Sequence, residues 1–131
     1  KDMDGSPEMR GRRLRMAREL AAQRTTAAVP NADVIVTNPT HFSVALKYDE
    51  ASMGAPRVVA KGADLLALRI RQLAGLSGVP IVERPPLARA LYWNVEVGSE
   101  VHPEHYEAVA DVLAYVYRTE AGAKRRPAAA S

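Results

Sequence analysis

The feature that most restricts the fold of this chain is a proline-containing turn between two strand-like stretches in residues 32–48. Residues 32–37 (ADVIVT) are continuously apolar at their centre, which favours a strand covered on both faces of a sheet. Residues 42–48 (FSVALKY) instead alternate, and their apolar face consists of Phe42, Val44, Leu46 and Tyr48. Asn followed by Pro is a common beginning of a turn. This segment therefore predicts two neighbouring strands joined by a tight turn.

The turn, Asn38-Pro39-Thr40-His41, also contains the groups needed for self-cleavage. An asparagine amide nitrogen can attack its own backbone carbonyl, closing a succinimide and expelling the amine of the next residue. Proline has no backbone N–H, so the competing attack by that nitrogen, which leads to deamidation, is blocked. Asn38 is then the nucleophile and Pro39 the leaving amine, while Thr40 and His41 are candidates to hydrogen-bond the carbonyl or move the proton. On these four residues alone, an ordinary turn without chemistry is the alternative.

The rest of the sequence predicts an α/β fold. A short strand is expected at residues 57–60, a turn at Lys61-Gly62, and then a helix at residues 63–76 and a strand at residues 79–83. The order strand, helix, strand is typical of a crossover unit. Further helices are expected at residues 85–94 and from Pro103 onward. We expect a single compact domain with a central sheet of about four strands flanked by three or four helices.

A basic helix is expected before this domain, over residues 8–25, with Ser6-Pro7 as its cap and first position. Its apolar stripe is thin, so it should project as a linker. The net charge of the chain is +3, and the positive excess lies at the two ends; the N-terminal cluster includes Arg10, Arg12, Arg13, Arg15 and Arg18. Such a cluster would attract anionic lipid head groups, and a solvated linker is the alternative. No nucleic acid is expected, because neither a recognition motif nor interleaved aromatic residues accompany the arginines.

Three parts are therefore predicted: a basic linker helix in residues 1–28, the folded domain in residues 29–119 and a disordered tail in residues 120–131. The chain has no cysteine, which excludes disulfides and thiolate metal sites and fits a reducing compartment. No metal or other cofactor is expected, since the three histidines lack ligand spacing; His102 and His105 are expected on the surface at a helix start.

No apolar run is long enough to cross a membrane. The chain does not begin with methionine and is expected to be the middle of a longer protein.

Residues 29–49 (VPNADVIVTNPTHFSVALKYD) closely resemble the cytoplasmic domain of the FlhB/YscU family, the self-cleaving switch proteins of type III export machines. Similar blocks follow in order at residues 55–64, 85–92 and 108–116, and the flagellar members are the more similar ones. The resemblance implies one intramolecular cleavage between Asn38 and Pro39, with no enzymatic turnover. It also implies transmembrane helices upstream of residue 1 and a location at the cytoplasmic face of the bacterial inner membrane.

The resemblance further implies partners. Export substrates would be recognised by an apolar patch that corresponds here to Ala55, Pro56, Ala110 and Leu113. The domain would control the change from rod and hook cargo to filament cargo, contacting the hook-length control protein and other export gate and ring components. The alternative for the patch is that Ala110 and Leu113 belong to the core while Ala55-Pro56 closes a loop.

Two other classes of function stay open. In the first, cleavage only matures the fold, and no exported protein is bound. In the second, the chain is a basic peripheral module that binds anionic lipid or nucleic acid through residues 10–24, with a steep dependence on salt. An injectisome homologue with the same switch role is a further alternative. The one tryptophan, Trp93, would be a natural partner contact if it is exposed.

Overall fold

A computed structural model describes the backbone of residues 6–39 and 41–130 and the side chains up to residue 120. The elements follow one another along the chain in the order helix α2 (Pro7–Ala28), 3-10 helix η1 (Val29–Asn31), strands β1 (Val34–Asn38), β2 (Phe42–Lys47) and β3 (Arg57–Ala63), helix α3 (Asp64–Ser77), strand β4 (Ile81–Glu83), helix α4 (Pro85–Asn94), 3-10 helix η2 (Pro103–His105) and helix α5 (Tyr106–Ala130). The predicted α/β class is confirmed.

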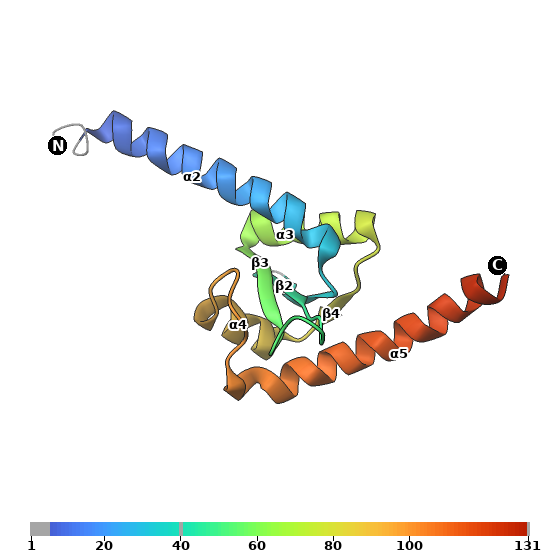
Figure 1. Cartoon of the computed structure of the whole chain (residues 1–131). Helices are drawn as coiled ribbons and strands as arrows, with labels where there is room; N and C mark the ends of the chain where they lie inside the picture. The colour runs from blue at the N-terminus through green and yellow to red at the C-terminus, as the bar shows by residue number, and fades with distance from the viewer. Residues whose placement is uncertain (1–5, 40, 131) are drawn as a thin grey trace.

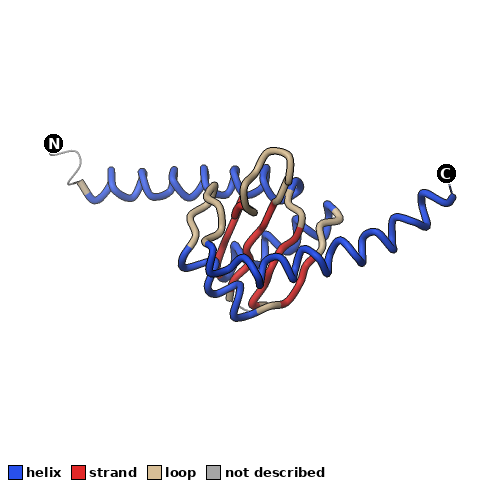
Figure 2. The backbone as a smooth tube through the Cα atoms, turned by 60° about the horizontal axis from the view of Figure 1, so that its bottom comes forward, coloured by secondary structure: helices blue, strands red, loops and turns tan. Residues whose placement is uncertain are grey.

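The four strands form one mixed sheet in the order β3-β2-β1-β4, and they lie side by side in Figure 2. Strand β2 pairs antiparallel with β1 and with β3, whereas β1 and β4 run parallel. Strands β3 and β4 are therefore the two edges, and the connection through α3 crosses from one edge to the other. The expected strand, helix and strand of the crossover are all present.

Helices cover both faces of the sheet. Figure 1 shows α3 on one side of the strands and α4 and α5 on the other. The hydrophobic core has two clusters of buried side chains, one on each face of the sheet. In β1, Val34 and Val36 belong to the cluster that includes residues of α4 and α5, and Ile35 belongs to the cluster that includes residues of α3. All three side chains are fully buried, so the apolar run predicted a doubly covered strand correctly.

Strand β3 is longer than predicted, because Lys61-Gly62 lies within it and does not form a turn. A Cβ atom placed on Gly62 would lie 2.5 Å from Cγ of Leu66 in α3, so the glycine marks a close approach of helix to strand. The ammonium group of Lys61 donates to the carbonyls of Tyr92 (2.7 Å) and Val95 (2.9 Å) at the end of α4. The two residues thus join β3 to helices on opposite faces.

Helix α2 projects from the body of the molecule, as predicted (Figure 1). Ser6 caps it, with its Oγ accepting from the backbone N–H of Met9 (3.3 Å). Thr25, near its end, is the buried residue of this helix, whereas Leu14 and Leu20 of the apolar stripe are about half exposed. Among the described residues, no helix is both long enough and apolar enough to cross a bilayer.

The last helix begins later and runs further than expected. Pro103 starts the 3-10 helix η2, and α5 follows from Tyr106. The backbone of α5 continues to Ala130, through the segment for which the sequence predicts a disordered tail. Alanine, lysine and arginine, which have high intrinsic helix propensity, dominate that segment, although it also contains Gly122 and Pro127. Its side chains lie outside those described.

Candidate functional site

The predicted cleavage turn joins β1 to β2 at one end of the sheet. Asn38 is the last residue of β1 and pairs with Phe42, the first residue of β2. The backbone N–H of His41 donates to the carbonyl oxygen of Asn38 at 2.8 Å, the hydrogen bond that closes a β-turn. Asn38 and Pro39 are half-buried and His41 is exposed; Thr40 lies outside the described residues. The predicted tight turn between neighbouring strands is present.

Backbone hydrogen bonds hold the chain on both sides of the bond between Asn38 and Pro39. The N–H of Arg84, which precedes α4, donates to the carbonyl of Thr37, and the N–H of Asp64, which begins α3, donates to the carbonyl of His41; both are 3.0 Å long. Asp64 adopts a positive φ of 53°, which is uncommon for a residue other than glycine. Neither contact could be predicted from the sequence, because backbone hydrogen bonds do not depend on the residue type.

This geometry places a donor on the carbonyl that cyclisation would attack. Attack on the backbone carbonyl carbon of Asn38 would develop negative charge on its oxygen. The His41 N–H already points at that oxygen, and pre-positioned backbone donors of this kind stabilise developing oxyanions. The turn thus holds one backbone donor on the Asn38 carbonyl oxygen, as a hydrogen-bonded β-turn does.

Aromatic side chains gather next to the turn. The ring of Phe42 stacks on Tyr92 of α4 with centroids 4.4 Å apart, and Trp93 meets both rings edge-on. Trp93 is 71% exposed. The sequence did not decide whether Trp93 is buried or exposed. It is an exposed side chain near the turn of residues 38–41.

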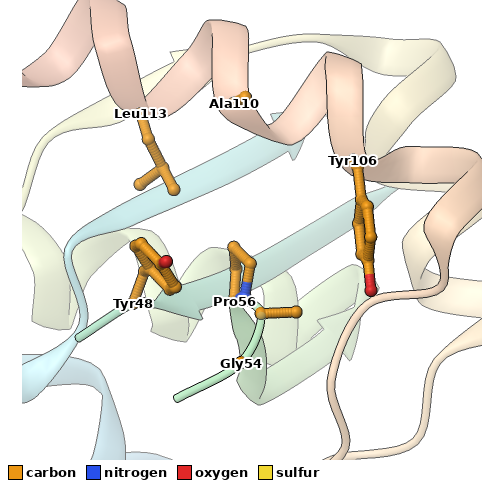
Figure 3. Close-up of a pocket in the computed structure, with 7 residues that line it drawn as sticks. Tyr48, Gly54, Pro56, Tyr106, Ala110 and Leu113 are labelled. Carbon is orange, nitrogen blue, oxygen red and sulfur yellow. The ribbon is translucent and has the colours of Figure 1, made fainter. Parts of the chain in front are cut away.

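The four residues of the predicted patch come together in a pocket at the opposite end of β2 (Figure 3). The pocket has a volume of about 200 Å³, and its lining consists of Tyr48, Gly54, Ala55, Pro56, Tyr106, Ala110 and Leu113. In Figure 3, Leu113, Ala110 and Tyr106 project from α5 toward Tyr48 and Pro56. Three lining residues, Tyr48, Gly54 and Tyr106, were not predicted; the contact of Tyr48 and Tyr106 with the patch depends on how α5 docks.

Exposure divides the four patch residues. Ala55 and Leu113 are 3% and 5% exposed, while Pro56 is half-buried and Ala110 is exposed. Leu113 therefore belongs to the core, as the alternative interpretation held, and it also forms part of the pocket wall. Ala110 is not a core residue. The accessible part of the patch is carried mainly by Pro56 and Ala110.

Comparison with known proteins decides the family of this chain. Residues 1–116 match the family model described as "FlhB HrpN YscU SpaS Family". The chain belongs to this family. It is 54% identical over 118 residues to the flagellar biosynthetic protein FlhB of Escherichia coli K12, and 51% identical over 131 residues to FlhB of Salmonella typhimurium LT2. These alignments cover 90% and 97% of the chain but 31% and 34% of the relatives, so the chain spans about a third of their length.

Solved structures of the FlhB HrpN YscU SpaS family have the same fold. The cytoplasmic domain of FlhB from Shewanella putrefaciens is 45% identical, with a TM-score of 0.76; the match covers 80% of this chain and 81% of that domain. The C-terminal domain of PscU is 36% identical, with a TM-score of 0.57 over 60% of this chain and 99% of that domain. The resemblance stated from the sequence is confirmed.

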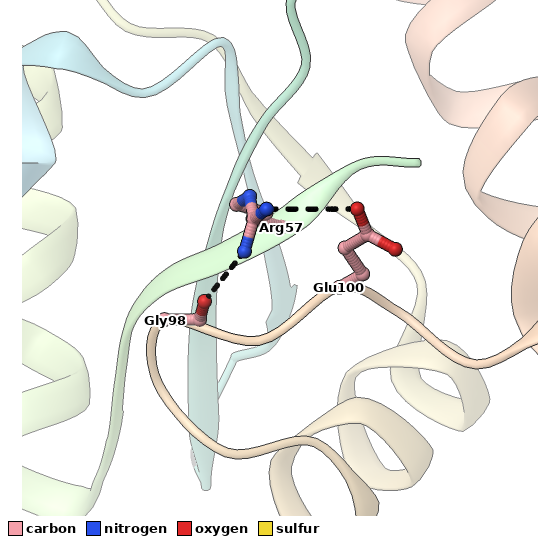
Figure 4. A network of polar contacts seen from close by, with 3 residues as sticks. All are labelled: Arg57, Gly98 and Glu100. Carbon is pink, nitrogen blue, oxygen red and sulfur yellow. Dashed lines mark hydrogen bonds and ion pairs between the residues drawn. The ribbon is translucent and has the colours of Figure 1, made fainter. Parts of the chain in front are cut away.

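Polar contacts lie near the pocket, in the loop before β3 and at the start of β3. The Asp49 carboxylate accepts from the Ser52 hydroxyl (2.8 Å) and from the backbone N–H of Ala51 (3.1 Å), and these bonds lower the pKa of Asp49. The Arg57 guanidinium donates to the Gly98 carbonyl at 3.0 Å and lies 3.6 Å from the Glu100 carboxylate (Figure 4). The first residue of β3 is therefore tied to the segment that leads into α5.

Of the two histidines that precede α5, one differs from the prediction. His102 is exposed as expected, but His105 is only 9% exposed and is not a surface residue. The 3-10 helix η2 directs the His105 ring toward the body of the domain. The sequence predicts an α-helix from Pro103, and the spacing of an α-helix does not indicate this inward direction. The same turn brings His102, Glu104 and His105 together, although the spacing in the sequence predicted no such cluster.

Proposed function

We propose that this chain is the cytoplasmic domain of a flagellar type III export component and that it cleaves its own backbone once, between Asn38 and Pro39. The observation that carries the proposal is the hydrogen bond of 2.8 Å from the His41 N–H to the Asn38 carbonyl, in a turn anchored on both sides. The reaction consumes its own substrate, so the chain is not a turnover enzyme.

The reaction balances within the turn. The side-chain nitrogen of Asn38 forms a bond to the backbone carbonyl carbon of the same residue, and the bond from that carbon to the Pro39 nitrogen breaks. One proton leaves the amide nitrogen and one reaches the Pro39 nitrogen, giving a C-terminal succinimide and a free proline amine. Water later opens the succinimide. The His41 backbone N–H stabilises the oxyanion, and the imidazole, on the exposed side of the turn, is the group that we assign to proton transfer.

Solved relatives support the choice of residues. Structures of the EscU C-terminal domain include variants in which an asparagine, the proline directly after it, or a histidine three positions after the asparagine is replaced. Asn38, Pro39 and His41 have the same spacing in this chain. These EscU domains are 33% or 34% identical to it.

The test is the appearance of a new amino terminus at Pro39. Denatured wild-type chain should separate into residues 1–38 and 39–131, whereas Asn38→Asp should remain whole, because a carboxylate of the same shape has no amide nitrogen with which to attack. Asn31→Asp is the matched control, since Asn31 is exposed and lies outside the turn; it should be cut like the wild type. An intact wild-type chain after long incubation at neutral pH would remove the proposal.

We further propose that the pocket between α5 and the loop before β3 binds apolar side chains of exported proteins, and that this binding serves the change from rod and hook cargo to filament cargo. Contact with the hook-length control protein and other gate and ring components belongs to the same proposal. Its support is the pocket itself, in which Pro56, Ala110 and Leu113 form a concave apolar surface.

Ala110→Glu tests the pocket more cleanly than a change at Ala55, which is buried. A charge at Ala110 should weaken binding of exported proteins without unfolding the domain, because this side chain is exposed. Ala114→Glu, on an exposed position of the same helix outside the pocket, is the control. Equal binding by the two variants would exclude the pocket.

For the full-length protein we propose a membrane anchor and a place at the cytoplasmic face of the inner membrane. In this arrangement helix α2 lies next to the bilayer, with Arg12, Arg15 and Arg18 exposed along it. Each basic residue near an anionic surface contributes about 1 kcal/mol of attraction. Binding of the chain to anionic vesicles should fall as salt is added, and binding to neutral vesicles should be absent; equal binding to both would reject this role.

A further inference from the structure

A cluster of metal-ligating side chains lies at the start of α5. One ligand atom from each of His102, Glu104 and His105 lies within 4.8 Å of the other two. The backbone N–H of His105 donates to the carbonyl of His102 at 2.9 Å, closing the 3-10 turn. Side chains three residues apart eclipse each other in such a turn, and the two rings indeed stack with centroids 6.2 Å apart.

The buried ring of His105 gives an independent reason to look for a ligand. Its Nε2 atom is shielded from solvent and has no hydrogen-bond partner among the described residues. A Glu104 oxygen lies 3.5 Å from this nitrogen, which is longer than an N–H···O hydrogen bond. A buried polar atom without a partner is costly, and such atoms in a native fold call for an explanation.

We propose that His102, Glu104 and His105 form a binding site for a divalent transition metal of the zinc class. Two imidazoles and one carboxylate are a donor set that suits zinc and leaves a fourth position open for water. Magnesium and calcium are disfavoured, because they require mostly oxygen ligands. The metal would bind the Nε2 atom, which the fold otherwise leaves without a hydrogen bond.

Exposed groups would have to move closer together to form the site, since the ligand atoms lie within 4.8 Å of one another. Ligands about 2.1 Å from a tetrahedral zinc lie roughly 3.4 Å apart. The Glu104 oxygen is already 3.5 Å from Nε2 of His105, and both Glu104 and His102 are exposed and free of core packing. His105 is held in place by burial and supplies the fixed ligand.

Electrostatics set the strength of the site. The amino-terminal end of α5 carries a partial positive charge that opposes a cation, and the carboxylates of Glu104 and Glu107 in this region offset it. We therefore expect reversible binding to a folded domain. Tyr106, the next residue, lines the pocket, so metal binding would fix the helix start that forms one pocket wall.

Zinc titration of the tag-free chain, freed of metal by a chelator, tests the site. Calorimetry should detect one zinc per chain, and NMR of the imidazole side chains should show shifts at His102 and His105 and none at His41, the third histidine. His102→Ala and Glu104→Gln should each weaken binding at least about tenfold. Glu83→Gln, at an exposed carboxylate in strand β4, is the control and should leave binding unchanged. These replaced residues are exposed, so the variants should keep the circular dichroism of the wild type.

Several results would overturn the proposal. Absence of a heat signal and of imidazole shifts at saturating zinc would exclude the site. Equal affinity in His102→Ala, Glu104→Gln and the wild type would place the metal elsewhere, as would a shift confined to His41. An equal response to magnesium would exclude a site built on imidazole nitrogen. None of these results depends on whether the chain cleaves itself.

Discussion

The two ends of strand β2 carry different kinds of site. At its start lies the turn of residues 38–41, which is organised by backbone hydrogen bonds from Asp64, Arg84 and His41. Beyond its other end lies the pocket, which is organised by side chains from the loop before β3 and from α5. The proposed role of the first site is a reaction of the backbone, whereas the proposed role of the second is to bind another molecule in a concave apolar surface.

The separation of the two sites constrains how a switch could work. Strand β2 has six residues, so the turn and the pocket are roughly 20 Å apart at about 3.3 Å per residue. The proposed cut after Asn38 would free the turn next to Phe42, Tyr92 and Trp93, and it would not touch the pocket directly. We therefore expect the primary change in surface at the turn, with any change at the pocket transmitted through the packed sheet.

The first prediction tests whether backbone groups, more than side chains, promote cleavage at the turn. Replacement of His41 by alanine removes the imidazole and keeps the backbone N–H, whereas His41→Pro removes both. Because the N–H lies on the oxygen that becomes charged, His41→Pro should cleave about 100 to 1,000 times more slowly than His41→Ala. The rate is measured by mass spectrometry of freshly synthesised, pulse-labelled chain.

Matched circular dichroism spectra of the two His41 variants serve as the folding control. If both variants fold and cleave at the same rate, the hydrogen bond to the Asn38 carbonyl has no part in the reaction. Both variants should keep the binding properties of the distant pocket.

The second prediction concerns the packing behind the turn. Gly62 pairs with Ser43 in the sheet, and a Cβ added to it would meet Leu66, so Gly62→Ala should lower the free energy of unfolding by about 1–3 kcal/mol. Gly75→Ala in α3 is the control: its Cβ meets nothing within 4 Å, and alanine should stabilise the helix by up to about 1 kcal/mol. Urea unfolding of both variants in an Asn38→Asp background gives the two values. Equal effects would show that the helix and strand do not approach as closely as described.

The third and smallest prediction concerns the pocket end. The Ser52 hydroxyl is the largest cause of the lowered pKa of Asp49, so Ser52→Ala should raise that pKa toward its ordinary value of 3.8. Because the folded pKa is lowered, the loop stabilisation from this carboxylate is present above the ordinary value and is lost as pH falls through the folded pKa. An NMR titration of Asp49 measures the shift, and little change in global stability is expected for this exposed side chain. Identical titration curves would exclude the hydrogen bond.

The comparison also explains what the sequence could predict. Residues 38–41 are contiguous, and their chemistry and flanking apolar patterns can be read locally, so the turn and both strands were predicted. The pocket joins Tyr48 and Tyr106, which are far apart in the sequence, and only the docking of α5 brings them together. The sequence predicts a turn at Gly62, because the close contact of this glycine with Leu66 of helix α3 is not visible in the sequence. The inward direction of His105 likewise depends on a 3-10 turn that the helical period does not predict.

The two pieces should stay together after cleavage, because β1 pairs with both β2 and β4 and buries Val34, Ile35 and Val36 completely. Mass spectrometry of one wild-type sample under native and denaturing conditions tests this most directly. We predict a single species with the mass of the whole chain plus one water in the native spectrum, and residues 1–38 and 39–131 as separate masses after denaturation. A denatured sample that is still intact, or a native sample in which the pieces are already apart, would contradict the account.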